Sequence, residues 1–388
     1  MLPDPQTRTR AYNQAATDEI SRYNAQQAGL KAVQPDIDLF QRQLQEQAQF
    51  NVAFEARNKP IYEAAYQALA GMLDGRRKFS LPLAVFIVEN TYADNTLNYP
   101  VFRAQLEELA DMCRKLAAND TRPVARFMAL HRLMTDTVHI SLDGKAVSKH
   151  LPYRYDLEDF RGEQNYTKQF VSKLLRTNTG QCHSLPLLYK MVADQLGVKA
   201  YLSMAPNHTF IQIKDNTGRL YRYETTNGHF VTDGYHMTTG YIKAGALKCG
   251  AYLDTLTTQQ NLACQVLNLA LGYEHYYGFD AFVYKCVALS LKYYPHGMQG
   301  NLLAYDAALA RFNQAATKAA PPSLAAAMQL PELKTRWAEV ERTRRILDAM
   351  GFEEMPKEKY AAWLQSLEAE KARQDTQRMA TRFQQNAH

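Results

Sequence analysis

Gly180-Gln181-Cys182-His183-Ser184 stands directly before an apolar helical pattern, and Asn207-His208-Thr209-Phe210 and Tyr223-Glu224 follow it along the chain. A cysteine, a histidine and a carboxylate thus occur in order, at the start of an expected helix and on two successive expected strands. A helix N-terminus and a neighbouring imidazolium both favour the thiolate, which is the nucleophilic form of cysteine. This arrangement predicts a site in which Cys182 attacks, His208 acts as base and then as acid, and Glu224 orients His208.

The start of the helix can be placed by a proline. Residues 185–196 carry apolar side chains at helical spacing, and Gly197 ends the pattern. Pro186 inside a regular helix would clash with the carbonyl group four residues earlier, which is that of Cys182. We therefore expect the regular helix to begin at about Ser184 and Cys182 to lie on the turn before it.

The carboxylate of the site follows from the parity of a predicted hairpin. Asp215-Asn216-Thr217-Gly218 is typical of a type I turn followed by a left-handed glycine. Residue 215 then pairs with residue 219, so Phe210 lies opposite Glu224 and His208 lies diagonal to Glu224 on the same face. Glu224 can therefore reach the imidazole, whereas Asn227, the rival for this role, falls on the other face of a regular strand.

The remaining pattern predicts many helices around a few strands. Residues 199–224 alternate or run in short β-rich blocks, and these are the only strands that we expect. Residues 141–165 combine turn residues with scattered aromatic residues, which indicates a long ordered loop near the site. Further helices are expected at residues 60–73, from residue 81, and at 100–118, 122–137, 257–272, 278–294, 298–317, 329–350 and 357–385.

Several reactive side chains are interpreted as structural. Glu89, on a largely buried helix, is expected at the edge of the buried stripe or satisfied by a cap or an arginine. Four cysteines fall in apolar helical patterns and are expected to pack: Cys113, Cys249, Cys264 and Cys286. His183, His229 and His236 could form a metal cluster with His208, but no tight pair such as His-x-x-x-His supports one, so no metal is expected.

Composition and charge exclude several classes of protein. The 388 residues are 46% hydrophobic and 22% charged, which suffices for a sizeable core. The net charge of +6 is mild and is not concentrated in either terminal segment, so nucleic acid is not an expected partner. Five widely spaced cysteines without a Cys-x-x-Cys pair do not indicate a disulfide framework.

The cellular location of the protein is predicted from two kinds of segment, a membrane-spanning helix and a signal peptide. No apolar stretch approaches the roughly 18 residues of a membrane-spanning helix, and the first 30 residues do not have a signal-peptide profile. The default expectation is therefore a cytoplasmic protein without a membrane span. If a leader has been removed from the chain, an exported protein of the periplasm or cell envelope is expected instead.

The last 60 residues contain both tryptophans, on an expected helical hairpin broken by Gly351 and Pro356. One apolar stripe consists of Leu333, Trp337, Val340 and Leu347, and the other of Tyr360, Trp363, Leu364 and Leu367. We expect these stripes to be packing surfaces that fold back on the body of the protein.

The motif around Cys182, with Pro206-Asn207-His208-Thr209-Phe210 and Tyr223-Glu224, resembles the bacterial transglutaminase-like superfamily. It is most similar to the branch in which this core is joined to tetratricopeptide-like helices. The resemblance covers about residues 60–230, implies a papain-like core, and assigns the nucleophile, base and acid to Cys182, His208 and Glu224. The acid of the family is usually Asp, and several relatives in this branch lack the cysteine, so the fold does not guarantee activity.

The oxyanion hole of such a site needs the Cys182 backbone N–H and a second donor from an earlier part of the chain. The candidates, which the sequence does not rank, are Gln164, Asn165, Tyr166 and Gln181.

These observations together predict an α+β protein that is mostly α, with a small antiparallel sheet. We expect a polar helical arm over residues 1–58 and a transglutaminase-like core over 59–245. Residues 246–325 are expected to form tetratricopeptide-like helices, and residues 326–388 the C-terminal helical hairpin.

Two functions of different classes are consistent with this organisation. The first is a cysteine hydrolase or acyltransferase that acts on peptide or side-chain amides through a thioester, without a cofactor. The second is an inert scaffold whose C-terminal helices bind a protein partner, and a structural protein of the cell envelope is a variant of it.

Overall fold

The computed structural model describes residues 60–142, 145–159, 162, 164–356, 358–359 and 365. The predicted arm over residues 1–58 and most of the predicted helix over 357–385, with Trp363, lie outside the described residues.

Four helices form the first part of the described chain, as predicted: α2 (Pro60–Leu73), α3 (Leu81–Tyr92), α4 (Tyr99–Leu116) and α5 (Pro123–Thr135). A proline stands in the first turn of each, where its missing N–H costs no helical hydrogen bond. The side chain of Ser80 caps α3 by accepting from the N–H of Leu83, and Asn98 caps α4 by accepting from Val101.

The expectation of a loop over residues 141–165 is wrong. This region contains an antiparallel hairpin of β1 (Val138–Leu142) and β2 (Lys145–His150), followed by the short strand β3 (Arg154–Tyr155). Strand β3 pairs in parallel with β4 (Thr179–Gly180), just before Cys182. Strands of two residues leave no periodic pattern in a sequence, because their partner and not their composition determines them.

The main sheet has the antiparallel order β5 (Ala200–Ala205), β6 (His208–Lys214), β7 (Leu220–Glu224) and β8 (His229–Val231). The predicted register is confirmed, since Lys214 pairs with Leu220 and Ile211 with Tyr223. Gly218 in the hairpin loop has a left-handed φ of 91°, as the predicted turn requires. Strand β8 was not predicted.

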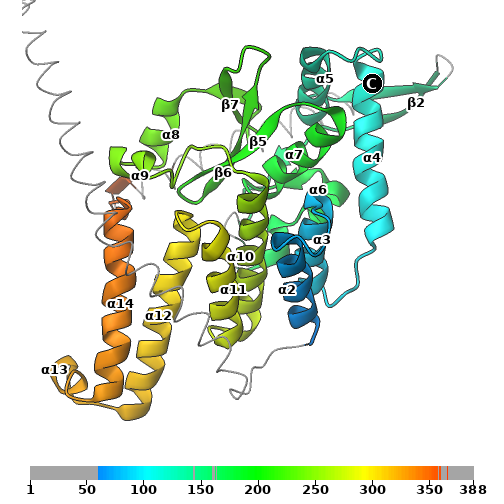
Figure 1. Cartoon of the computed structure of the whole chain (residues 1–388). Helices are drawn as coiled ribbons and strands as arrows, with labels where there is room; N and C mark the ends of the chain where they lie inside the picture. The colour runs from blue at the N-terminus through cyan, green and yellow to red at the C-terminus, as the bar shows by residue number, and fades with distance from the viewer. Residues whose placement is uncertain are drawn as a thin grey trace, which may run out of the picture.

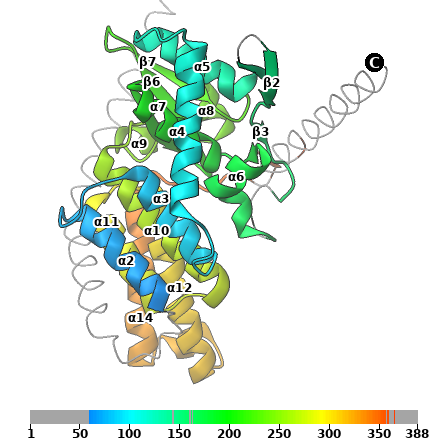
Figure 2. The ribbon, with the colours of Figure 1, turned by 90° about the vertical axis from the view of Figure 1, so that its right-hand side faces the viewer.

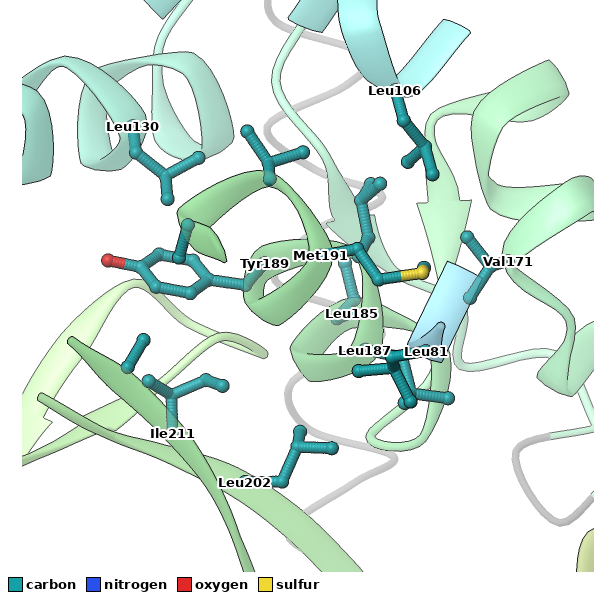
Figure 3. Packing of buried hydrophobic residues seen from close by; sticks show 14 of the residues in the cluster. Leu81, Leu106, Leu130, Val171, Leu185, Leu187, Tyr189, Met191, Leu202 and Ile211 are labelled. Atoms are coloured by element: carbon teal, nitrogen blue, oxygen red, sulfur yellow. The ribbon is translucent and has the colours of Figure 1, made fainter. Parts of the chain in front are cut away.

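Helix α7 (Ser184–Leu196) lies at the centre of the domain and begins where Pro186 predicts. Figure 3 shows apolar side chains of α7, among them Leu185 and Tyr189, between α4 and α5 on one side and the sheet on the other. Leu106, Leu130, Leu202 and Ile211 complete this packing and are nearly or fully buried. The core therefore fixes the helix that follows Cys182 on several sides.

Short elements connect the larger ones around the site. The single-turn helix η2 (Tyr166–Gln169) and helix α6 (Val171–Thr177) precede β4, while α8 (Asp233–Thr239) and α9 (Ala244–Lys248) follow the sheet. None of these four was predicted, because each is too short to show a helical period.

The C-terminal part is helical, as predicted, with α10 (Thr258–Tyr277), α11 (Ala281–Tyr293), α12 (Met298–Ala319) and α14 (Pro331–Ala349). The short helix α13 (Leu324–Ala327) was not predicted. Helix α14 packs along α12 through the buried Leu333 and Val340 (Figure 1). In the described part of the chain, no helix is both long enough and apolar enough to cross a membrane.

The N-terminal and C-terminal helices share a core. In Figures 1 and 2, α2 lies beside α10 and α11, while α4 lies over α7. One buried apolar cluster joins Tyr62 and Leu69 of α2 to Val266 and Tyr273 of α10. The fold is α+β and mostly α, with its small sheet at one end of a helical body.

Candidate active site

The turn that carries Cys182 depends on a glycine. A Cβ atom on Gly180 would lie 2.7 Å from Oγ of Ser184 and 2.9 Å from Cδ1 of Leu174. The hydroxyl of Ser184 accepts the N–H of Gln181 at 3.1 Å, which ties the turn to the first residue of α7. Pro186 has no N–H to donate to the carbonyl of Cys182, so the helix begins after the cysteine.

Cys182 is partly exposed and faces the turn between β5 and β6. Its Sγ lies 3.6 Å from the carbonyl oxygen of Asn207, to which the thiol donates. Asn207 has a left-handed φ of 53°, a conformation that asparagine tolerates better than most residues. The tight turn places His208 at the first position of β6, next to Cys182.

His208 joins the cysteine to the carboxylate. Its Nε2 lies 2.7 Å from Oε2 of Glu224 on the neighbouring strand, as the hairpin parity predicts. Burial alone would lower the pKa of His208, but its hydrogen bonds to Cys182 and Glu224 and the charges of both outweigh this effect and raise the pKa to about 10. The imidazole is thus held in its protonated form near neutral pH.

Glu224 is buried, with 1% of its side chain exposed, and several groups surround its two oxygens. Thr226 donates from Oγ1 to Oε2 at 3.3 Å. Nε2 of His236, on α8, lies 3.4 Å from Oε1. Asn227 takes no part in this arrangement, since its side-chain oxygen accepts the N–H of His229.

Tyr155 is a further site residue that the sequence analysis missed. Strand β3 places it beside Gly180, and the N–H of Asp156 donates to the carbonyl of Gly180 at 2.7 Å. Burial first, and then the charge and hydrogen bond of Cys182, raise the pKa of the Tyr155 phenol well above its usual range. The two aromatic residues of β3 and its flank were the only signal, and their role depends on a strand too short to predict.

A buried ion pair holds Tyr155 in place. Nζ of Lys173 on α6 lies 2.6 Å from Oδ2 of Asp156 and also donates to the carbonyl of Thr179 at 2.8 Å. Both charged side chains are about nine-tenths buried. The pair therefore fastens β3 to β4 and to the helix before it.

The four oxyanion candidates from the sequence make other hydrogen bonds. Gln181 donates from its side chain to the carbonyl of Asp159, and Tyr166 donates from its hydroxyl to the carbonyl of Asn268. The backbone N–H groups of Gln164 and Asn165 donate to Oδ2 of Asp159. Among the described contacts, no hydrogen bond joins any of the four to Cys182.

A small cavity with both polar and apolar walls lies behind the turn of Cys182. It is lined by Glu89 and His183 together with Gln265 and Asn268 of α10. Nδ2 of Asn268 lies 3.3 Å from Nε2 of His183, and burial lowers the pKa of His183 to about 4. The residue after Cys182 is thus held by a helix from the C-terminal part of the chain.

Glu89 caps a helix, as one of its two predicted interpretations requires. Its Oε1 accepts the N–H of Val171 at 2.6 Å and its Oε2 that of Ser172 at 2.9 Å, at the N-terminus of α6. Burial raises the pKa of Glu89 to about 7, although these hydrogen bonds lower it. The carboxylate is structural and supports the segment that leads to Cys182.

The other cysteines and histidines are dispersed. Cys113 and Cys286 are fully buried in helices and Cys264 is partly buried in another, as predicted, whereas Cys249 follows the end of α9. Within the described ranges, no three side chains of His, Cys, Asp or Glu gather in a way that could hold a metal ion.

The geometry brings a cysteine, a histidine and a carboxylate together from a helix start and two neighbouring strands. Residues 101–237, which include these three residues and His236, match the model of the transglutaminase-like superfamily, and this part of the chain is a transglutaminase-like domain. A search of curated proteins and a search of solved structures found no match to the chain. The membership in a branch with tetratricopeptide-like helices stays a prediction.

Proposed function

We propose that the protein is a cysteine hydrolase or acyltransferase that acts on peptide or side-chain amides. The observation that carries this proposal is the continuous contact from the partly exposed Cys182 through His208 to the buried Glu224, with 2.7 Å between the last two. Nε2 of His208 is engaged by Glu224, so Nδ1 is the nitrogen left to face the thiol. This division of the two nitrogens is what a cysteine nucleophile with an oriented base requires.

The first half of the reaction forms a thioester. His208 is already protonated and faces the sulfur through Nδ1, and the Cys182 thiolate beside it adds to the carbonyl carbon of the substrate to give a tetrahedral oxyanion. The oxyanion collapses as the C–N bond breaks, and the His208 imidazolium gives its proton to the leaving nitrogen. Glu224 holds the imidazolium in orientation.

The second half of the reaction releases the acyl group. His208 accepts a proton from water or from an amine as that molecule adds to the thioester. The C–S bond then breaks, which restores the Cys182 thiolate beside the protonated His208. Water gives a hydrolase and an amine gives a transglutaminase.

Tyr155 and the backbone N–H of Cys182 are the proposed oxyanion donors. The phenol hydroxyl of Tyr155 contacts the nucleophile, and its raised pKa keeps the hydroxyl protonated so that it can donate. The β3 to β4 pairing and the Lys173 to Asp156 ion pair hold the ring before substrate arrives. Such fixed donors lower the barrier because they need no reorganisation during the reaction.

Alkylation with iodoacetamide tests the nucleophile directly. Cys182 is expected to label faster than the four other cysteines, as read by mass spectrometry of digested protein, and His208→Ala is expected to slow its labelling. Release of 4-nitrophenol from 4-nitrophenyl acetate is expected to show a burst that Cys182→Ala abolishes. Slow labelling of Cys182 together with equal ester cleavage by Cys182→Ala would favour the scaffold with an inert core.

A further inference from the structure

We infer that His236 is a positioning residue of this site, which holds one oxygen of Glu224 so that the other faces His208. The inference rests on the proposed function for its catalytic meaning, but the geometry that it describes can be measured without a substrate. His236 lies on the short helix α8, just inside the end of the matched range 101–237.

The two oxygens of Glu224 have separate partners. Oε2 receives His208 at 2.7 Å and Thr226 at 3.3 Å, whereas Oε1 faces Nε2 of His236 at 3.4 Å. Only 1% of the Glu224 side chain and 2% of the His236 side chain are exposed. Neither Oε1 nor Nε2 has a hydrogen-bond partner among the described residues, although the two buried atoms face each other at 3.4 Å, so each is the polar group at hand to satisfy the other.

One face of the His236 ring is covered by an aromatic side chain. It stacks on Phe210 with 3.9 Å between ring centroids and 26° between ring planes. Phe210 lies two residues after His208 on β6, and its ring is parallel to that of His208 within 10°, with 6.5 Å between the ring centroids. The same aromatic side chain thus packs directly on His236 and lies beside His208, the two imidazoles that face the carboxylate.

Helix α8 is anchored at both ends. Arg222 on β7 pairs with Asp233 in the first turn, with 2.6 Å between Nη1 and Oδ1. Gly240, at the C-terminal end, lies close to Pro206 in the β5 to β6 turn, and a Cβ atom on Gly240 would be 3.1 Å from Cδ of Pro206 and 2.8 Å from the carbonyl oxygen of His236. These contacts hold α8 against the turn that presents His208.

The charge of His236 fits the role of a neutral donor. Burial lowers its pKa to about 4; the charges of His208 and Arg222 also lower it, while those of Glu224 and Asp233 oppose this change. A neutral imidazole can donate one N–H to Glu224 without competing for the negative charge that stabilises the His208 imidazolium. The single donor steers the carboxylate and leaves its charge for His208.

Substitution of His236 separates this role from simple packing. His236→Phe keeps the stack on Phe210 and removes the donor, and His236→Gln restores an N–H donor. Met237→Leu, at the next residue of the same helix, leaves the donors of Glu224 unchanged and is the matched control. Thermal unfolding of each variant shows whether α8 still packs.

Two readouts are compared. The first is the downfield proton NMR resonance of the His208 Nε2–H, which a short hydrogen bond to a carboxylate produces and which Glu224→Gln identifies by its loss. The second is the rate constant for alkylation of Cys182 by iodoacetamide. His236→Phe is expected to broaden or shift the resonance and to slow alkylation about tenfold, whereas His236→Gln and Met237→Leu retain both.

An unchanged resonance and an unchanged alkylation rate in a folded His236→Phe protein would overturn the inference. Failure of His236→Gln to restore either readout would also overturn it, because the donor would then not be the relevant property. If the resonance responds as expected while Cys182 of the wild type labels no faster than the other cysteines, the positioning role holds and the proposed function fails.

Discussion

His208 and Glu224 lie on neighbouring strands with 2.7 Å between Nε2 and Oε2, and the glutamate has only 1% of its side chain exposed. A buried carboxylate next to an imidazole favours the imidazolium, since each charge is costly without the other. The pair therefore links protonation of the site to the stability of the fold.

The first prediction concerns the pH dependence of stability. The pKa of His208 is raised to about 10 in the folded protein, above its value of about 6.5 in an unfolded chain. The folded state binds the extra proton in this window, so the contribution of the pair to the free energy of unfolding is complete below about pH 6.5 and is lost as the pH rises toward 10.

Urea unfolding of the wild type and of Glu224→Gln at several pH values measures this contribution. The free energy of unfolding of the wild type is expected to fall relative to that of Glu224→Gln as the pH rises through the window. A constant difference between the two proteins would show that the pair does not raise the pKa of His208.

Tyr155→Phe is predicted to separate acyl transfer from simple alkylation. Removal of one oxyanion donor typically slows acyl transfer by about 10²-fold or more, whereas alkylation by iodoacetamide forms no oxyanion. We expect the burst with 4-nitrophenyl acetate to slow strongly and the labelling of Cys182 to change little. An equal loss in both assays would instead mean that Tyr155 acts on the thiol itself.

Glu89→Gln is predicted to make the free energy of unfolding less dependent on pH between about pH 4.5 and pH 7. Burial raises the pKa of Glu89 from 4.5 to about 7, so the folded state favours the protonated form and the free energy of unfolding falls as the pH rises from about 4.5 to about 7. The shift corresponds to about 3 kcal/mol over this range. Denaturant unfolding of both proteins at about pH 4.5 and pH 8 measures it, and equal slopes would contradict the prediction.

Gly180→Ala is predicted to disturb the turn of Cys182. The added methyl group would meet Ser184 at 2.7 Å and Leu174 at 2.9 Å, which is closer than atoms pack without movement. We expect a loss of about 1–3 kcal/mol in the free energy of unfolding and slower alkylation of Cys182. Gly234→Ala on α8 is the control, because its Cβ would find only Oγ1 of Thr232, at an ordinary 3.7 Å.

The sequence predicted those parts of the site that depend on local rules. Pro186 fixed the helix start, and the turn at residues 215–218 fixed the register that brings His208 to Glu224. Tyr155 and His236 could not be assigned this way, because β3 has two residues and α8 has seven, and only tertiary packing brings them to the site. Strand β1 carries an apolar residue at every second position, Val138, Ile140 and Leu142, which is the period of a half-buried strand, but three such positions are too few to distinguish a strand from a loop.

The contact between Asn268 and His183 bears on whether the part of the chain that carries Cys182 can fold without the C-terminal helices. Residue 268 lies beyond the end of the matched range at 237, and the α2 side chains of the shared core likewise pack on α10. A fragment cut after residue 245 would expose the apolar faces of α2 and α3 and would lose one support of the turn of Cys182. We expect it to aggregate, while the whole chain unfolds in a single transition in calorimetry, because the domain that carries the site is not an autonomous folding unit.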